Sequence, residues 1–375
     1  MKLLFTCGGT AGHINPAIAL ARLFQFRHQD CQVLFAGADN GMERTLVPHE
    51  GYELRTVHVS TIHRGWKWKD VKHNIHTVVT LPLARRQARS ILDEFQPDLV
   101  VGTGGYASYP VVRAAAKQGI PTAIHESNAI PGLTTRLLED HADLIMVGFE
   151  ECRKNYKHPE KVLVTGTPVR GDFFACTRGE AKAKLGLDDG RPVIVSFWGS
   201  LGAAVMNRQM AEFLALEAGD GVPFHHIHGA GTVGCRQMGT YLAQAGADLE
   251  KAPGLEVREY IHDMGTLMRA ADLVICRAGA STISELTALG VPAIIVPSPN
   301  VAGDHQTYNA RVLADAGGAV MIPENSSSGR LLYDTARAIL TDDSRRRAMA
   351  QAMASLGTVD AAEKIYSAVM ALRRR

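Results

Sequence analysis

The chain has 375 residues, of which 46% are apolar and 21% are charged, and this composition is typical of a globular enzyme of about two domains. Lys and Arg number 40 against 38 Asp and Glu, and the resulting net charge of +2 argues against a general nucleic-acid coat, which would be basic throughout. The sequence has no apolar run of transmembrane length, no long apolar core at its N-terminus and no CxxC pair. It therefore predicts no transmembrane helix, no signal peptide and six reduced cysteines.

One local pattern occurs four times along the chain: a short apolar run, then a glycine turn, then a helical pattern. In the first half, the apolar run 2–7, the turn 8–13 and the helical pattern 16–24 follow one another, as do 98–101, 102–105 and 110–118. In the second half, the corresponding ranges are 192–197, 199–202 and 203–214, and then 273–276, 277–280 and 282–289. Such apolar runs are typical of parallel strands that are buried on both faces. Their alternation with helices predicts a doubly wound α/β fold.

The spacing of the turns divides the chain into two similar halves. Gly8 and Gly199 are 191 residues apart, and Gly102 and Gly279 are 177 residues apart, so each half has an early and a late turn. Two tandem Rossmann-like domains facing across a cleft explain this spacing, with the turns at the carboxyl ends of the strands, where open α/β sheets bind ligands. Gly166 interrupts the pattern and predicts domains at residues 1–166 and 167–356.

A glycine turn that leads into a helix favours anion binding, because backbone N–H groups approach the anion and the helix dipole attracts it. For any single turn, a tight connection without a ligand is an equally good explanation, but four turns favour at least one phosphate site. A dinucleotide-binding dehydrogenase is a weak match, because the first turn lacks GxGxxG spacing, although Asp39 imitates the acid that binds ribose. The chain also lacks the GxxxxGK[ST] motif of P-loop proteins.

Two side chains near these turns are candidates for chemistry. Glu285 follows the last turn, where a carboxylate can accept two hydrogen bonds from a ribose diol; the alternative is an ordinary solvated acid near a helix start. His13 follows the first turn, and an imidazole, which titrates near neutral pH, can act as a general base. The alternative for His13 is a capping or packing role.

Seven segments in chain order resemble the MurG family of UDP-N-acetylglucosamine transferases, within glycosyltransferase family 28. They are residues 8–17 (GGTAGHINPA), 104–106 (GGY), 125–132 (HESNAIPG), 166–170 (GTPVR), 199–203 (GSLGA), 277–285 (RAGASTISE) and 304–310 (DHQTYNA). The resemblance extends over about residues 1–320, and the combination is specific although each segment alone is weak evidence. It implies a GT-B fold in which the C-terminal helix, residues 357–375, packs back on the first domain.

The resemblance also implies a reaction. GlcNAc would move, with inversion, from UDP-GlcNAc to the MurNAc 4-hydroxyl of undecaprenyl-diphospho-MurNAc-pentapeptide, the step from lipid I to lipid II in peptidoglycan synthesis. The implied partners are UDP-GlcNAc, lipid I, an anionic membrane surface and other cell-wall synthesis proteins, with no nucleic acid. No tightly bound cofactor or metal site is expected, and a divalent cation would stimulate without being required. The implied location is peripheral, on the cytoplasmic face of the plasma (inner) membrane.

The family's functional positions carry over to this sequence residue by residue. His13 matches the catalytic base, and Glu126 is a second catalytic candidate on the acceptor side. The acceptor candidates are Gly104, Gly105 and Tyr106. The donor candidates are Thr10, Ala11, Gly12, Asn128, Arg170, Ser200, Ile261, Ala280, Ser281, Thr282, Ile283, Ser284, Glu285 and Gln306. The first domain would therefore face the acceptor and the membrane, and the second would bind UDP-GlcNAc.

Three segments depart from the family pattern. The family's HEQN has Ser127 in third position here, and its GNPVR has Thr167 in second position. Its GGSQGA reads WGSLGA, so Leu201 replaces a glutamine in the phosphate turn. This replacement puts a side-chain role at residue 201 in doubt, whereas the backbone geometry of the turn should persist.

Residues 61–90 carry seven basic side chains and a single acid, interleaved with tryptophans and apolar residues. Cations beside tryptophans suit the interface of an anionic membrane. The predicted membrane patch consists of Trp66, Lys67, Trp68, Lys69, Lys72, Ile75 and Val79. The alternatives are a solvated basic helix or a nucleic-acid patch, and no motif supports the second.

Three other functions remain open from the sequence. A related glycosyltransferase with another lipid or metabolite acceptor would share most of these motifs. A UDP-GlcNAc 2-epimerase shares the two-domain architecture, but its carboxylate pattern has no match here. A non-catalytic nucleotide-sugar-binding protein is disfavoured because His13 and Glu285 are both present.

Overall fold

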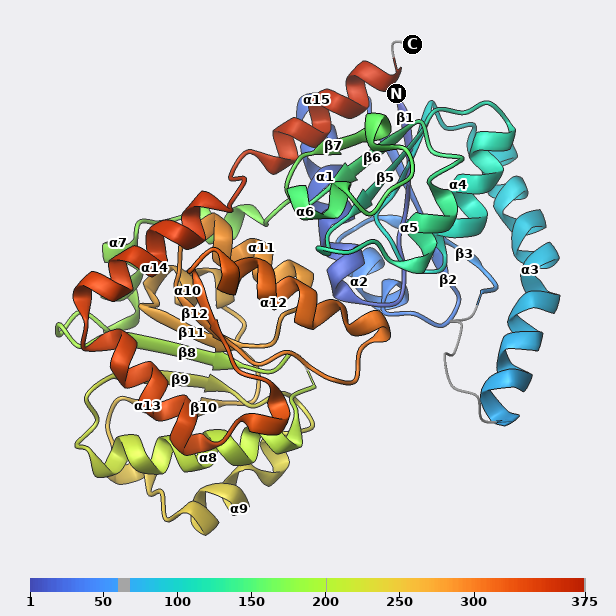
Figure 1. Cartoon of the computed structure of the whole chain (residues 1–375). Coiled ribbons are helices and arrows are strands. Elements are labelled where there is room, and N and C mark those ends of the chain that lie inside the picture. The colour runs from blue at the N-terminus through green and yellow to red at the C-terminus, as the bar shows by residue number, and fades with distance from the viewer. Residues whose placement is uncertain (60–67, 200, 374–375) are drawn as a thin grey trace. The chain divides into compact units, whose positions relative to one another are not determined.

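The structure, a computed structural model, describes residues 1–59, 68–199 and 201–373, with the side chains of residues 69–79 and 302 outside the description. It divides into two compact units (Figure 1): unit 1 is Met1–Arg170 with Thr358–Arg375, and unit 2 is Gly171–Gly357. The first boundary thus falls four residues after the predicted one. Residue 166 still belongs to unit 1 because its backbone N–H and carbonyl group are bonded to Val147 and His125 of that unit.

Unit 1 is built on a seven-stranded parallel sheet with the strand order β3-β2-β1-β4-β5-β6-β7. The strands are β1 (Lys2–Thr6), β2 (Gln32–Ala38), β3 (Glu53–Val57), β4 (Leu99–Gly102), β5 (Thr122–Glu126), β6 (Leu144–Val147) and β7 (Val162–Val164). The helices are α1 (Ala11–Arg27), α2 (Glu43–His49), α3 (Trp68–Phe95), α4 (Ser108–Lys117), α5 (Leu133–Leu138), α6 (Glu150–Arg153), a 3-10 turn at Pro159–Lys161 and α15 (Ala361–Arg373).

Helices cover both faces of this sheet, because alternate residues of each strand point to opposite sides. Leu3 and Phe5 of β1 pack into one core with α1, where Ile365 and Val369 of α15 also lie. Leu4 packs into the other core, with the buried face of α3 and with α4. The C-terminal helix therefore completes unit 1, as the family resemblance implied.

Unit 2 contains a second parallel sheet, with the strand order β10-β9-β8-β11-β12-β13. The strands are β8 (Val193–Phe197), β9 (His225–Gly229), β10 (Leu255–Arg258), β11 (Leu273–Cys276), β12 (Ala293–Ile295) and β13 (Ala319–Met321). The helices are α7 (Arg178–Leu185), α8 (Ala204–Gly219), α9 (Cys235–Ala245), α10 (Met264–Ala270), α11 (Ala280–Leu289), α12 (His305–Asp315), α13 (Gly329–Leu340) and α14 (Asp343–Ser355), with 3-10 turns at Gly171–Phe174, Leu249–Lys251, Ala302–Asp304 and Glu324–Ser326. Two parallel α/β units confirm the predicted doubly wound fold.

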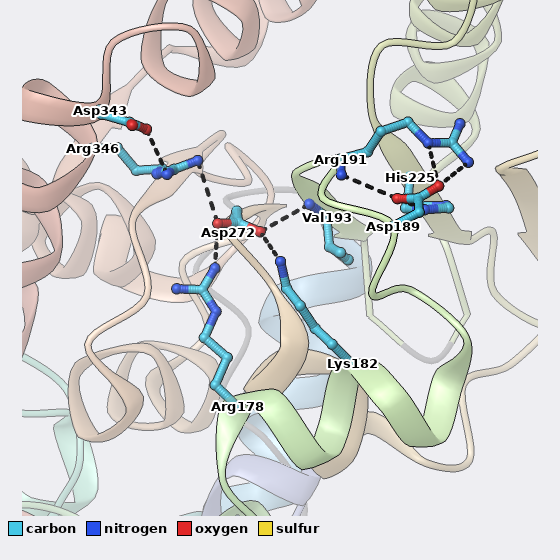
Figure 2. Close-up of polar contacts among 9 residues, drawn as sticks. All are labelled: Arg178, Lys182, Asp189, Arg191, Val193, His225, Asp272, Asp343 and Arg346. Carbon is cyan, nitrogen blue, oxygen red and sulfur yellow. Dashed lines mark hydrogen bonds and ion pairs between the residues drawn. The ribbon is translucent and has the colours of Figure 1, made fainter.

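One buried carboxylate ties together the amino ends of the unit 2 strands (Figure 2). Asp272, which precedes β11, accepts hydrogen bonds from Lys182 Nζ at 2.8 Å and from the N–H of Val193 at 3.0 Å, and it also pairs with Arg178 and Arg346. Burial alone would raise the pKa of Asp272, but the hydrogen bond from Lys182 and the charge of Arg178 hold it below its ordinary value. The cluster joins α7, α14 and two strands at the edge of the sheet opposite the glycine turns, so we regard it as scaffold.

All four predicted glycine turns lie at carboxyl ends of parallel strands. They follow β1 and β4 in unit 1 and β8 and β11 in unit 2, and in each sheet these two strands are neighbours. No helix in the described part of the chain is long and apolar enough to cross a bilayer.

Candidate active site

Three loops meet at the carboxyl edge of the unit 1 sheet, because β1, β4 and β5 are adjacent. The turn after β1 carries Thr10, Ala11, Gly12 and His13; the turn after β4 carries Gly104, Gly105 and Tyr106; the loop after β5 carries Asn128. The N–H of Thr103 donates to the Thr6 carbonyl at 2.9 Å, which joins the first two turns through their backbones. The predicted catalytic, acceptor and donor residues of unit 1 other than Arg170 are therefore grouped at one edge.

The first two turns approach each other so closely that only glycines fit between them. A Cβ on Gly105 would lie 2.1 Å from the Gly8 carbonyl oxygen, and a Cβ on Gly104 would lie 2.5 Å from His13 Nδ1. Both glycines have positive φ angles, +80° and +105°, which other residues rarely adopt. Thr103 Oγ1 donates to the His13 carbonyl oxygen at 2.7 Å, so the position of the histidine is determined by the β4 turn.

The environment of His13 favours a neutral imidazole. Burial lowers the pKa of His13 below its ordinary value of 6.5, while the negative charges of Glu126 and Glu43 and a hydrogen bond at the Thr103 backbone offset part of that effect. A neutral imidazole can accept a proton, which is the protonation state a general base needs at neutral pH. The structure thus places His13 in the chemical state that the predicted role requires.

Glu43 is a residue of this edge that the sequence analysis missed. Its side chain is fully buried, and its carboxylate accepts hydrogen bonds from the N–H of Gly9 at 3.0 Å and from the N–H of Ala38 at 2.7 Å. A Cβ on Gly37 or Gly41 would lie 2.5 Å or less from Glu43, so glycines leave the space that its side chain occupies. Two glycines close to one acid in the sequence were the available signal.

Both carboxylate oxygens of Glu126 are occupied by hydrogen-bond donors from the loop that follows it and from the start of α5. Oε1 accepts from the N–H and the side-chain Nδ2 of Asn128, at 3.0 and 2.8 Å, and Oε2 accepts from the N–H of Gly132 at 2.8 Å and from Thr135 Oγ1 at 2.7 Å. The side chain is 4% exposed. We predicted Glu126 as a catalytic residue, but this geometry favours a positioning role, in which the carboxylate fixes the loop that carries Asn128.

Ser127, one of the departures from the family pattern, bonds to the preceding histidine. His125 Nε2 lies 2.9 Å from the Gly166 carbonyl oxygen, which can only accept, so this nitrogen carries the proton. Burial lowers the pKa of His125, so the ring is neutral and its Nδ1 accepts from Ser127 Oγ at 3.3 Å. His125 thus joins β5 to the segment that leads out of unit 1, and Ser127 holds the other side of its ring.

At the carboxyl edge of unit 2, two glycine-containing turns interlock. The turn at residues 198–203 follows β8, and the turn at 230–234 follows β9. The N–H of Gly234 donates to the Leu201 carbonyl oxygen at 3.2 Å, and a Cβ on Gly202 would lie 2.0 Å from the Ala230 carbonyl oxygen. The Leu201 side chain is 65% exposed, so its observed contribution to the turn is made by the backbone. Ser200 lies outside the described residues.

Helix α11 begins at the same edge with its first N–H groups uncapped by any side chain. Gly279 is its N-cap residue, and Ala280, Ser281, Thr282, Ile283, Ser284 and the half-buried Glu285 form its first two turns. Free N–H groups at a helix start are suited to an anion. This geometry supports the predicted phosphate-binding role of the segment.

Gln306 joins the two loops beside α11. Its Oε1 accepts from the N–H of Ser298 at 2.8 Å and from the N–H of Ala278 at 3.3 Å. Because two donors occupy the amide oxygen, the NH2 end of the side chain is the part suited to a ligand. Asn309, on the same helix, donates from Nδ2 to the Ala278 carbonyl oxygen at 3.1 Å, so α12 fixes the start of the α11 turn.

The remaining predicted donor residues lie in different places. Ile261, in the loop after β10, is buried against the carboxyl end of β9, where a Cβ on Gly229 would lie 3.1 Å from its Cδ1. Arg170 is exposed and is the last residue of the first segment of unit 1. Ile261 therefore belongs to the unit 2 edge, whereas Arg170, like the candidates at residues 10–12 and 128, belongs to unit 1.

The predicted membrane patch falls on and before α3. Trp66 and Lys67 lie outside the described residues, as do the side chains of Lys69, Lys72, Ile75 and Val79. Trp68 is 82% exposed at the start of α3, and Leu83, Arg85, Arg86 and Arg89 are exposed further along it. The opposite face of the helix, with Ala84, Ala88, Ile91 and Leu92, is buried in unit 1. The described part of α3 is thus amphipathic, and its outer face is basic over residues 85–89.

Among the residues whose side chains are described, no group of three His, Cys, Asp or Glu is placed to hold a metal ion. The six cysteines are free.

Comparison with known proteins identifies the family. Residues 3–147 match the glycosyltransferase family 28 N-terminal domain, and residues 193–365 match the glycosyltransferase family 28 C-terminal domain. A relative from Acetivibrio thermocellus is 39% identical over 369 residues, covering 98% of this chain and 97% of its own, and one from Bacillus subtilis is 34% identical over 375 residues, covering 100% of both. Both are named UDP-N-acetylglucosamine--N-acetylmuramyl-(pentapeptide) pyrophosphoryl-undecaprenol N-acetylglucosamine transferase.

Solved structures agree with this assignment. The crystal structure of Acinetobacter baumannii MurG matches with a TM-score of 0.77 at 26% identity, covering 99% of each chain. A UDP-GlcNAc 2-epimerase from Neisseria meningitidis matches with a TM-score of 0.66 at 14% identity, covering 99% of this chain and 100% of its own, which shows a shared fold alone. The two-unit architecture is therefore the GT-B fold. With both domain models matched and full-length relatives well above 30% identity, the chain belongs to the MurG family of glycosyltransferase family 28.

Proposed function

We propose that this protein is the inverting transferase that moves GlcNAc from UDP-GlcNAc to the 4-hydroxyl of the MurNAc in undecaprenyl-diphospho-MurNAc-pentapeptide. The observation that carries the proposal is the position of His13 against the glycine turn after β4, where burial lowers its pKa, in a chain whose full-length relatives carry this activity in their names. In the reaction the acceptor oxygen bonds to C1 of GlcNAc, the bond from C1 to the UDP oxygen breaks, and the hydroxyl proton must be accepted by a base.

His13 is the base in this proposal. Its Nδ1 lies against the Gly104 backbone, so we expect Nε2 to receive the proton from the acceptor hydroxyl. Gly105 and Tyr106 belong to the same turn, and Tyr106 lies over Gly9, whose Cβ position is 3.3 Å from the tyrosine ring. We assign this turn to the acceptor. Glu126 acts as a positioning residue through its bonds to Asn128.

The donor is assigned to unit 2. The uncapped start of α11 offers N–H groups to the diphosphate, whose charge increases as UDP leaves. The interlocked turns after β8 and β9 lie at the same edge of the sheet and are assigned to the same ligand. Glu285 accepts hydrogen bonds from the ribose hydroxyls, the NH2 group of Gln306 donates to the GlcNAc hydroxyls, and the backbone at Ile261 contacts the uracil. Residues 10–12, Asn128, Ser200 and Arg170 remain part of the proposed donor set on the basis of the family resemblance alone.

We propose that the reaction proceeds without a resident metal, because backbone N–H groups take over the stabilisation of the leaving diphosphate. Helix starts and turn N–H groups stabilise a leaving diphosphate electrostatically, which is the task a divalent cation performs in other transferases. We propose that a cation stimulates the enzyme without being required. Activity should therefore persist after chelation with EDTA.

Location follows from the acceptor and from α3. The relatives' names specify an undecaprenol-linked substrate, and the outer face of α3 presents Trp68, Arg85, Arg86 and Arg89. An exposed tryptophan near one end of a helix and cations further along it suit the headgroup region of an anionic bilayer. We propose peripheral attachment to the cytoplasmic face of the plasma (inner) membrane, with other cell-wall synthesis proteins as neighbours.

One experiment separates this function from its alternatives. The protein is incubated with UDP-GlcNAc and a lipid I analogue, and UDP release, disaccharide product and UDP-ManNAc are followed together. The proposal expects UDP release that depends on the acceptor and equals product formation. UDP release at the same rate without acceptor, or accumulation of UDP-ManNAc, as an epimerase would produce, contradicts it.

A further inference from the structure

A chain of five polar side chains crosses the core of unit 2 between α8 and the strands β8 and β9. Glu217 Oε2 lies 2.8 Å from His226 Nδ1, and His226 Nε2 lies 2.8 Å from Ser196 Oγ. Ser196 Oγ also lies 2.8 Å from His228 Nδ1, and His228 Nε2 lies 3.2 Å from Asn207 Oδ1. All five side chains are completely buried. We call them the core polar chain.

Local structure explains why these residues meet. His226 and His228 are two apart on β9 and so point to the same face, and the strand register pairs His228 with Ser196. Asn207 and Glu217 are ten apart on α8, about 2.8 turns, so both side chains fit within the broad helix face that covers this side of the sheet, where they reach the two histidines. The core polar chain therefore runs along β9 toward its carboxyl end.

The direction of every hydrogen bond beyond His226 follows from the last member. Asn207 Nδ2 lies 2.8 Å from the Ala230 carbonyl oxygen, which can only accept, so Oδ1 faces His228 and His228 Nε2 must carry a proton. Burial and the neighbouring His226 lower the pKa of His228 to about 3, so this ring is neutral and its Nδ1 accepts from Ser196. The Ser196 hydroxyl uses its hydrogen in the bond to His228, so its oxygen accepts a hydrogen bond from His226 Nε2.

The Ala230 carbonyl is the point where the two glycine turns of the unit 2 edge meet. A Cβ on Gly202 would lie 2.0 Å from this oxygen, and a Cβ on Gly234 would lie 2.4 Å from it. The N–H of Gly234 in turn donates to the Leu201 carbonyl. A hydrogen bond that fixes the Ala230 carbonyl therefore fixes the turn after β8 and the turn after β9 together.

We infer that the core polar chain is a positioning network, which holds the two turns in the shape that binds the donor diphosphate. This inference rests on the proposed function, because it assigns those turns to UDP-GlcNAc. A polar chain in a core is costly to bury, and an apolar set of the same volume would serve packing equally well. What an apolar set would not provide is a directed hydrogen bond to the Ala230 carbonyl.

The protonation pattern is tested on the wild-type full-length protein, labelled with ¹⁵N-histidine. Imidazole ¹H–¹⁵N correlation spectra between pH 6 and 8 should assign to His228 a single proton on Nε2, and to His226 a proton on Nε2. A proton on Nδ1 of His228, or a doubly protonated His228, overturns the inference. This measurement requires neither a folded variant nor any enzymatic activity.

The consequence for the turns is tested with Ser196→Ala, which removes the central hydroxyl, and Ser196→Thr, which retains it. Calorimetric titration of the full-length protein with UDP should show about tenfold weaker binding for Ser196→Ala and near wild-type binding for Ser196→Thr. Steady-state assays should show a raised KM for UDP-GlcNAc in Ser196→Ala, with kcat within about twofold of wild type at saturating donor.

Tyr333→Phe is the matched control, since it removes a buried hydroxyl that bonds Asp220, in the same core but outside the core polar chain. It should leave UDP binding unchanged. A folded Ser196→Ala that binds UDP as wild type does, or a Tyr333→Phe that weakens binding equally, overturns the positioning role. A wild-type protein that fails to bind UDP contradicts the proposed function instead, and the ¹⁵N pattern still decides whether the core polar chain is polarised as inferred.

Discussion

Gly104 and His13 are in direct contact: a Cβ atom on residue 104 would lie only 2.5 Å from His13 Nδ1, so the imidazole occupies the space that a side chain there would need. The two residues come from turns on neighbouring strands, and the same turns are joined a second time by the bond from Thr103 to the His13 carbonyl. The orientation of the proposed base is thus set by backbone on one side and by a threonine hydroxyl on the other.

Gly104→Ala should lower kcat at least tenfold, because the new Cβ displaces the imidazole and the φ of +105° is unfavourable for alanine. The measurement is kcat and KM for both substrates. Gly179→Ala is the control, since a Cβ there meets nothing within 4 Å and lies in a helix, where alanine is favoured. If Gly104→Ala keeps wild-type kcat, the contact has no role in turnover.

His13→Ala should reduce turnover more than it reduces donor binding, because the base acts on the acceptor hydroxyl. In the wild type, burial holds the pKa of His13 below 6.5, and neutral imidazole is the active form. The kcat–pH profile should therefore be flat above neutrality and fall only as the pH decreases through that lowered pKa. The exposed His49 provides the control His49→Ala. Equal losses of kcat and of UDP-GlcNAc affinity would make His13 a binding residue instead.

Glu43→Gln should move the acidic limb of the kcat–pH profile to lower pH. The Glu43 charge raises the pKa of His13, so its removal lets that pKa decrease further. The variant should also lose about 1–3 kcal/mol of unfolding free energy. The carboxylate accepts hydrogen bonds from two backbone N–H groups, and in the variant the amide NH2 would face one of these donors without an acceptor. Glu53→Gln, on the exposed side of β3, is the matched control and should change neither property. An unmoved acidic limb in folded Glu43→Gln contradicts the coupling.

Glu285→Ala should raise the KM for UDP-GlcNAc about tenfold or more, with a smaller effect on kcat, since a carboxylate bonded to two hydroxyls contributes about 1.5–3 kcal/mol per bond. A donor that lacks the ribose 2′-hydroxyl makes the assignment specific. Wild type should lose affinity for the deoxy donor, whereas Glu285→Ala should bind both donors equally. Glu250→Ala, on another helix of unit 2, is the control. If Glu285→Ala and wild type lose the same affinity when the 2′-hydroxyl is absent, Glu285 does not bind the ribose.

Replacing Arg85, Arg86 and Arg89 together by glutamine should weaken binding to vesicles of phosphatidylglycerol and phosphatidylcholine, by about 1 kcal/mol per residue at low salt. Co-sedimentation at two salt concentrations measures the change, and the difference from wild type should shrink at high salt. The control replaces the exposed Arg236, Arg345 and Arg347 of unit 2 in the same way. Equal losses for both triple variants would show a charge effect that is not specific to α3.

Much of the fold was predictable because β1, β4, β8 and β11 are buried on both faces and lead into glycine turns. The apolar runs at 2–7 and 273–276 became β1 and β11 almost without change. The unit boundary was placed too early, at residue 166, since Gly166 and Pro168 are turn formers inside an extended segment that still belongs to unit 1. Local breaks in a pattern mark turns, whereas a unit boundary depends on tertiary contacts.

The site was predictable where backbone geometry determines it and unpredictable where side chains meet through the fold. The glycine turns follow from local pattern, and His13 was singled out by the family resemblance. The four donors around Glu126 come from residues two to nine positions further along the chain and depend on how the loop after β5 folds. Glu43 was missed because an acid at a helix start is ordinary in a sequence. Its burial beneath the first turn exists only once β1 and β2 are paired.

The contact between Gly166 and Thr358 has a consequence for how this chain can be rearranged. A Cβ on Gly166 would lie 2.5 Å from the Thr358 side chain, so the segment that leaves unit 1 touches the segment that returns to it. In topological terms unit 2 is an insertion, carried between two adjacent points of a host. A short peptide joining those points would close unit 1 around its own C-terminal helix, and unit 2 would be released as a separate module that carries the proposed donor site.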